Sequence, residues 1–156
     1  MKCFLGLALP LYVIDQITKY LTVKHIPFGE SIPVIPGFFD LVFYINTGAA
    51  FGMLQDKNYF FVGLATVALI VLVVLKIRGA FSDKLESVAW ALLLSGVAGN
   101  LTDRMFRGSV VDFLDFTLPF YGHWPAFNIA DSCICVAAAL LIWTAFFTPQ
   151  KSTPAQ

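Results

Sequence analysis

The sequence predicts an α-helical membrane protein with four transmembrane helices and a small β platform outside the bilayer. Hydrophobic residues make up 58% of the 156 residues and charged residues only 13%, about half the charged share of a soluble domain. Long apolar runs alternate with polar segments, and one polar segment is interrupted by prolines and glycines. We therefore expect a single integral-membrane domain covering residues 1–156.

The first predicted span covers residues 3–23, enough to cross a hydrocarbon core of ~30 Å. It follows Lys2 and begins with twelve uncharged residues. A signal peptide can begin in the same way, but no small-x-small cleavage site follows, so we expect a retained helix. Asp15 and Lys19 lie four positions apart and can pair on one helix face. Either this pair neutralises itself near the interface with Lys19 snorkelling outward, or Asp15 contacts a basic group on another helix.

The β platform is expected at residues 24–57, where prolines and glycines separate short β-branched and aromatic runs. The runs 31–35 and 39–45 are typical of strands. Because open sheet edges do not occur in hydrocarbon, the platform should lie at the membrane surface. Gly48 and Ala49, in the turn that follows, permit close approach to a ligand, although the same turn can simply lead back to the bilayer.

Three further spans are predicted at residues 59–75, 85–103 and 126–147, and glycines and prolines predict a loop at 105–125. Four spans place both termini on the same side of the membrane. The positive-inside tendency places the basic connector 76–84, and with it both termini, in the cytoplasm. Five basic residues are then inside and four outside: Lys2, Lys76, Arg78, Lys84 and Lys151 against Lys24, Lys57, Arg104 and Arg107.

Composition and motif searches exclude several function classes. The net charge of zero and the pI near 6.7 provide no basic surface for nucleic acid. The three cysteines lie in or beside apolar runs without metal-ligand spacing, so no metal or other cofactor is expected. The sequence contains no H-E-x-x-H, G-x-S-x-G or phosphate-binding glycine loop. His25 and His123 are isolated in the sequence and are interpreted as interfacial residues.

Four of the ten acidic residues fall between Gly99 and Ser132, between apolar runs. Ionisable residues are costly in a membrane unless they are paired or face water, so this cluster predicts a functional site. We expect Asp112 to pair with Asp131. Two carboxylates in one site cannot both ionise easily, so one keeps a proton while the other accepts one, and together they can activate water against an amide. Asp115 is a weaker partner for Asp112, because both would lie on one unsupported connecting segment.

Two other functions are possible. The chain could be a small proton-coupled carrier or an assembly subunit, with Asp15, Asp103, Asp112 and Asp131 as a relay. A relay predicts acids spread through the depth of the bilayer, whereas these gather at one face, with Asp15 as a possible exception. A presenilin-type protease would carry a Gly-x-Gly-Asp signature, which is absent from this sequence.

Five sequence blocks resemble those of the lipoprotein signal peptidases, the type II signal peptidases of bacteria. They occur in the order and spacing of that family, and Thr102 is a departure at a position that is usually aliphatic. The blocks are Asp15-Gln16-x-Thr18-Lys19, Asn46-Thr47-Gly48-Ala49-Ala50-Phe51-Gly52, Gly99-Asn100-Leu101-x-Asp103-Arg104, Val110-Val111-Asp112-Phe113 and Phe127-Asn128-x-Ala130-Asp131-Ser132.

The resemblance implies four transmembrane helices with an extracytoplasmic β cradle, a bacterial inner-membrane location and a catalytic dyad of Asp112 and Asp131. It also implies a substrate, a prolipoprotein whose lipobox cysteine bears diacylglycerol and is cut on the N-terminal side of that cysteine. Membrane lipid is the expected surrounding, and we expect a monomer. The expected supporting or substrate-binding residues are Asp15, Lys19, Asn46, Gly48, Ala49, Gly99, Asn100, Asp103, Arg104, Asn128 and Ala130.

Overall fold

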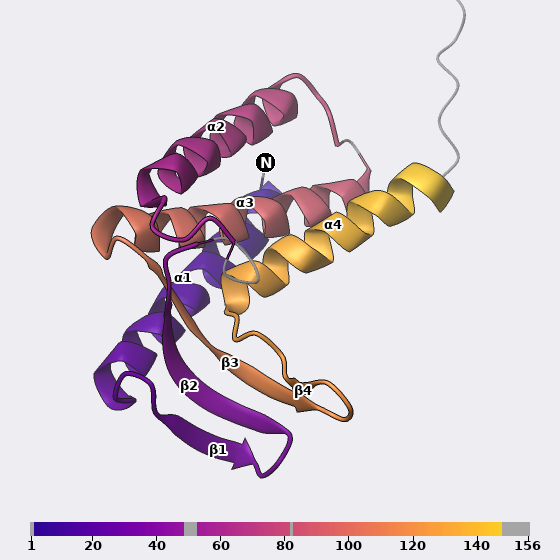
Figure 1. Ribbon diagram of the computed structural model, residues 1–156. Helices are drawn as coiled ribbons and strands as arrows, with labels where there is room; N and C mark the ends of the chain where they lie inside the picture. The colour runs from indigo at the N-terminus through magenta and orange to yellow at the C-terminus, as the bar shows by residue number, and fades with distance from the viewer. Residues whose placement is uncertain (1, 49–52, 82, 148–156) are drawn as a thin grey trace, which may run out of the picture.

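The computed structural model describes residues 2–48, 53–81 and 83–147, with side chains from residue 6 onward. In this part of the chain four helices pack together beside one end of a four-stranded sheet (Figure 1). The elements in chain order are α1 (Lys2–His25), β1 (Ser31–Ile35), β2 (Phe39–Asn46), α2 (Asn58–Ile77), α3 (Lys84–Phe106), β3 (Val110–Leu118), β4 (Gly122–His123) and α4 (Ile129–Phe147).

Helix α3 is the centre of the bundle and packs against α1, α2 and α4. Small residues explain how close the helices come. A Cβ atom added at Gly96 would collide with the carbonyl oxygen of Ala130 on α4, and one added at Gly99 would collide with the carboxylate of Asp15 on α1. The absence of a side chain at these two glycines therefore permits tight contact between the helices.

Three of the described helices, α2, α3 and α4, are long and apolar enough to cross a membrane. Helix α2 is the clearest case, since only 6% of its most apolar window is buried inside the protein, and Leu64, Val67 and Ile70 are more than half exposed. An apolar surface of this kind needs a lipid environment. Helix α1 has 24 residues and is long enough, but it is not among the three helices apolar enough to cross a membrane, because polar and charged residues occupy its second half.

The sheet is antiparallel throughout, in the order β1-β2-β3-β4. Strands β1 and β2 occupy the two runs that were expected to be strands. The prediction that residues 105–125 form a loop is wrong, because β3 is the longest strand and pairs along β2. Its run of valine, leucine and phenylalanine favours a strand, but two aspartates within it obscured the pattern.

Candidate active site

The two aspartates of the predicted dyad come from different elements. Asp112 is the third residue of β3 and is 3% exposed, whereas Asp131 lies in the first turn of α4. They are close enough to interact, because the negative charge of Asp131 contributes to raising the pKa of Asp112. The fold thus brings together two carboxyl groups that are 19 positions apart in the sequence.

Asn128, which is fully buried, connects these two carboxyl groups. Its amide Nδ2 donates a hydrogen bond of 2.7 Å to Oδ1 of Asp112, and its backbone N–H donates one of 3.3 Å to Oδ2 of Asp131. A second contact of Nδ2, to the carbonyl oxygen of Val111, fixes the plane of the amide. One residue therefore positions both members of the pair.

Local sequence explains why Asp131 is held at this place. Asn128 precedes the first residue of α4, and its Oδ1 accepts the backbone N–H of Asp131 at 2.9 Å. Asp131 accepts the backbone N–H of Asn128 in return. This reciprocal pattern is a capping box, here built from asparagine and aspartate. The N-terminus of a helix also favours a negative charge in its first turn, where Asp131 lies.

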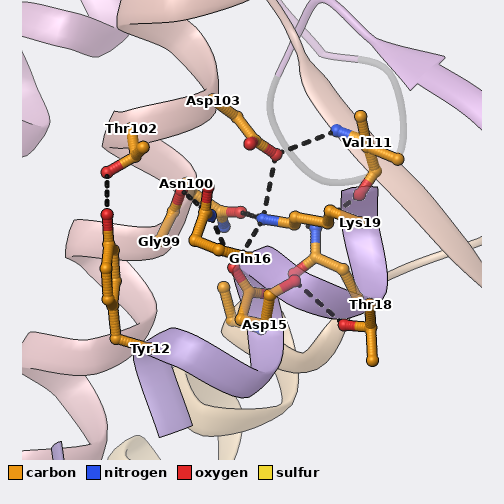
Figure 2. Close-up of polar contacts among 12 residues, drawn as sticks. Tyr12, Asp15, Gln16, Thr18, Lys19, Gly99, Asn100, Thr102, Asp103 and Val111 are labelled. Carbon is orange, nitrogen blue, oxygen red and sulfur yellow. Dashed lines mark hydrogen bonds and ion pairs between the residues drawn. The ribbon is translucent and has the colours of Figure 1, made fainter. Parts of the chain in front are cut away.

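The other oxygen of Asp131 is bound by Asn100 of α3, whose Nδ2 donates a hydrogen bond of 2.7 Å. The orientation of this amide is set from its opposite end. Lys19 of α1 donates to Oδ1 of Asn100 at 3.0 Å, as Figure 2 shows. Because an ammonium group can only donate, it must face the amide oxygen, and the amide nitrogen is left to face Asp131.

Lys19 is completely buried, and its ammonium group also contacts two carboxylates at 3.0 Å each, those of Asp15 and Asp103 (Figure 2). The three contacts use all three of its hydrogen-bond donors. The prediction that Lys19 snorkels outward is therefore wrong. The alternative, in which Asp15 contacts a basic group on another helix, is not what the structure shows either, because Lys19 makes the contact to α3.

Each of the two aspartates that pair with Lys19 also binds a backbone N–H group of another helix or strand. Oδ1 of Asp15 accepts the backbone N–H of Ala130 on α4 at 2.9 Å. Asp103 forms an ion pair with Arg107 and accepts the backbone N–H of Val111 on β3 at 3.2 Å. This cluster of two buried acids, the buried Lys19 and the partly exposed Arg107 is formally neutral, and it joins α1, α3, α4 and β3 around the dyad.

Asp112 is also held from the side of β2. Its Oδ2 accepts a hydrogen bond of 3.0 Å from Nδ2 of Asn46, the last residue of that strand. The oxygen of the same amide accepts the backbone N–H of Gly48, and the carbonyl oxygen of Gly48 accepts Nη2 of Arg104 at 2.8 Å. Ala49, which was also predicted to be a site residue, lies outside the described residues.

The environment of Asp112 raises its pKa from the ordinary value of 3.8 to about 7. Burial is the main cause, because it disfavours the charged form, and the nearby charge of Asp131 adds to the shift. Hydrogen bonds from Asn46 and Asn128 act in the opposite direction. A carboxyl group with a pKa near neutrality can give and take a proton under ordinary conditions, which suits acid–base catalysis.

The structure brings every predicted site residue that it describes into one connected set of contacts around Asp112 and Asp131. Several members of this set were not predicted as site residues, among them Gln16, which donates to Asp15 and to the carbonyl oxygen of Gly99; Arg107, which pairs with Asp103; and Asn58, which donates to the carbonyl oxygen of Arg104. Arg107 could have been found from its spacing, since it follows Asp103 by four positions.

Two expectations about other polar residues can be compared with the structure. His123 is not isolated, because its Nδ1 lies 2.8 Å from Oδ2 of Asp115. Cys133 and Cys135 are free thiols. Within the described residues no group of three or more histidine, cysteine, aspartate or glutamate side chains is arranged to hold a metal ion.

A family model and the known relatives agree on one family. Residues 7–147 match the family model described as signal peptidase (SPase) II. The lipoprotein signal peptidase of Yersinia enterocolitica serotype O:8 / biotype 1B is 41% identical over 154 residues, covering 96% of this chain and 90% of the relative. That of Bacillus pumilus is 44% identical over 135 residues and covers 86% of each chain. A solved bacterial membrane enzyme, determined by the in meso method at 2.3 Å, has a TM-score of 0.86 at 34% identity, covering 98% of this chain and 95% of its own.

Proposed function

The chain belongs to the signal peptidase II family, and from this membership we propose that Asp112 and Asp131 are the catalytic dyad with which it removes signal peptides from prolipoproteins. The enzyme is a membrane protease of the aspartic type. The observation that carries the residue assignment is that one buried residue, Asn128, binds both interacting carboxyl groups, that of Asp112 through its side-chain amide and that of Asp131 through its backbone N–H.

The two carboxyl groups differ in their surroundings, and we assign their roles accordingly. Asp131 sits at a helix N-terminus and accepts hydrogen bonds from Asn100 and Asn128, so it is the ionised base. Asp112, with its pKa near 7, carries the proton. Asp131 takes a proton from a water molecule while the water oxygen attacks the scissile carbonyl carbon and Asp112 protonates the carbonyl oxygen. When the C–N bond breaks, Asp131 gives its proton to the leaving nitrogen, and the proton of the diol returns to Asp112.

The surrounding amides keep this geometry. Asn46 and Asn128 hold the two oxygens of Asp112, while Asn100 holds Asp131. Arg104, through its bond to the carbonyl oxygen of Gly48, ties the turn after β2 to α3. Gly48 must be small at this position, because an added Cβ would collide with the carbonyl oxygen of Met53.

The finer substrate assignment is a prolipoprotein whose cysteine bears diacylglycerol, cut on the N-terminal side of that cysteine. A substrate with acyl chains arrives through the bilayer, so its scissile bond meets the enzyme where membrane-crossing helices end. This assignment is supported by the position of Asp131 in the first turn of α4 and by the short distance in sequence between the end of α3 and Asp112.

We further propose that α1 is a fourth span in a monomeric, multi-pass inner-membrane protein. Two of the charges that lower the hydropathy of α1 are those of Asp15 and Lys19, and both side chains are buried and paired inside the bundle. Four spans place both termini in the cytoplasm and the dyad at the outer face, in agreement with the basic connector between α2 and α3.

The alternative of a proton-coupled carrier is not favoured. A relay needs acids spread through the bilayer, and Asp15, the acid that could have been an exception, joins the same cluster as Asp103. The direct test of the proposed function is incubation of the purified protein in detergent with a diacylglyceryl-modified prolipoprotein. We expect one cut, before the modified cysteine, as read by mass spectrometry. Cleavage elsewhere, or equal cleavage by Asp131→Asn, would refute the assignment.

A further inference from the structure

A second site candidate is a hollow of about 460 Å³ on the sheet, bordered by Ser31, Asp40, Asp115, His123 and Trp124. Strand register places its polar residues on one face. Asp40 and Asp115 are cross-strand partners, Ser31 is the partner of Val42, and His123 is the partner of Thr117. Because side chains alternate along β3, Asp112 faces the other side of the sheet from Asp115, and the hollow extends along β2 as far as Tyr44, the cross-strand partner of Asp112.

The hollow has an excess of negative charge. Like charges directly opposite each other on neighbouring strands are destabilising, and Asp40 and Asp115 occupy such a pair. Asp115 is only 7% exposed, and its Oδ2 contacts Nδ1 of His123 at 2.8 Å. Its Oδ1 is buried and has no hydrogen-bond partner among the described residues. A buried carboxylate oxygen without a donor is costly, so the site lacks a positively charged donor.

The chemistry of the hollow favours an organic cation over a metal ion. Asp40, Asp115 and His123 do not form a group that could hold a metal ion. A lysine ammonium or an arginine guanidinium, by contrast, can donate hydrogen bonds to both carboxylates. The indole of Trp124 at the border offers an aromatic surface to the same cation.

The two faces of the sheet indicate where this cation comes from. The face of Asp112 carries two apolar rows, in which Ile32, Leu41 and Leu114 form one and Ile35, Phe39 and Phe116 the other. That face suits lipid. The acidic hollow lies on the opposite face and therefore looks away from lipid, toward polypeptide that has left the membrane.

Resting on the proposed function, we propose that the hollow binds a lysine or arginine side chain of the mature segment, downstream of the bond that is cut. From Asp112 to Asp115 the strand advances by about 10 Å, and crossing to the other face adds a similar distance. An extended peptide covers this path with about six residues. The hollow is thus a specificity site for a basic residue near that position of the mature chain.

The test uses diacylglyceryl-modified peptides that differ only in a single lysine, moved along the mature segment, with glutamine as the reference. For wild-type enzyme we expect kcat/KM to be about fivefold higher when the lysine stands near the sixth position, through KM, as for a partly exposed ion pair. Asp115→Asn should lose this preference. His123→Ala should weaken the preference for lysine. Because His123 is exposed, this substitution should not impair folding. Glu86→Gln, on α3, is the matched control and should keep the preference.

The outcomes separate this proposal from the proposed function. If wild-type enzyme cleaves all peptides equally, or if Asp115→Asn keeps the lysine preference, the hollow is not a substrate site although the enzyme is a peptidase. If no peptide is cleaved, the proposed function itself fails. If phosphatidylethanolamine in the detergent micelles abolishes the preference while phosphatidylglycerol does not, the cation is a lipid headgroup, and the assignment to the mature segment is overturned.

Discussion

Lys19 of α1 contacts the side-chain oxygen of Asn100 of α3 at 3.0 Å, and the nitrogen of that amide contacts Asp131 at 2.7 Å. A fully buried ammonium group thereby determines which end of Asn100 faces the dyad. The same ammonium group neutralises Asp15 and Asp103, which are equally buried. Lys19 is therefore a positioning residue for the proposed catalysis as well as a structural one.

Replacing Lys19 by methionine should destabilise the protein and reduce turnover. The variant leaves the buried carboxylate of Asp15 without a cation and that of Asp103 with Arg107 alone, for which the expected cost is about 3–5 kcal/mol. It also frees the amide of Asn100 to flip. The measurements are thermal unfolding in detergent and the cleavage rate of the folded fraction. Lys24→Met, at an exposed position of the same helix, is the control and should change stability by less than about 0.5 kcal/mol. Equal unfolding temperatures for the two variants would contradict the cluster's role.

Asp112→Asn and Asp131→Asn should each lower kcat by about a thousandfold or more, since each removes one proton-transfer group. Both asparagines are close in size to aspartate, so the variants should still fold. The cleavage rate is measured on equal amounts of folded protein. Asp56→Asn makes the same chemical change at an exposed turn and should leave the rate unchanged. A near wild-type rate in either dyad variant would show that the assignment is wrong.

The pH dependence of kcat/KM should have a falling limb with a midpoint near 7. The pKa of Asp112 is raised to about 7, so its protonated form dominates below that pH and is lost above it. If Asp112 supplies the proton to the carbonyl oxygen, activity must decrease as that form disappears. Because the two carboxyl groups interact, the midpoint reports the pair. A rate that keeps rising from pH 6 to pH 9 would exclude Asp112 as the acid.

Much of this arrangement follows from local sequence, and the rest depends on tertiary contacts. The apolar run of α2 and the proline-bounded runs of β1 and β2 are governed by short-range preferences, so they could be predicted. Strand β3 could not be predicted, because two aspartates in a run of apolar residues indicate a polar loop unless the partners of these aspartates are known. Those partners, Asn128 and His123, follow the aspartates by 16 and 8 positions.

The burial of Lys19 is a second feature that local sequence could not predict. Spacing correctly suggested that Asp15 and Lys19 pair, because four positions place them on one helix face. It could not reveal that Asp103, 84 positions later in the chain, makes the second ion pair. With one carboxylate a lysine near a membrane snorkels to water, whereas with two carboxylates and an amide it can remain inside.

The proposed topology predicts that the connector between α2 and α3 is cytoplasmic. A single cysteine introduced at Ser82, in a protein whose native cysteines are replaced by alanine, should not react with a membrane-impermeant maleimide in intact cells. Ser82 lies outside the described residues. A cysteine at Glu30, in the exposed turn before β1, is the matched control and should react. The reverse labelling pattern would invert the orientation and place the dyad at the cytoplasmic face.

Gly99→Ala should damage the site without touching either catalytic group. A Cβ at this position would lie 2.6 Å from Oδ2 of Asp15 and 3.2 Å from Cβ of Ala130, so α1 and α4 must move away from α3. Such overpacking costs about 1–3 kcal/mol. It also weakens the bond from the backbone N–H of Ala130 to Asp15, one residue before Asp131. We therefore expect lower thermal stability together with a lower kcat on modified substrate.

The matched control for this last change is Gly63→Ala in α2, because a Cβ there meets no atom within 4 Å. Alanine is a better helix former than glycine, so the control should be slightly stabilising, by about 0.5–1 kcal/mol, and should leave kcat unchanged. Thermal unfolding and cleavage are measured for both variants in the same detergent. If Gly99→Ala behaves like Gly63→Ala, the close approach of α1, α3 and α4 does not hold the dyad. If it loses both stability and kcat, the distance between these helices controls the position of Asp131 through Asp15 and Ala130.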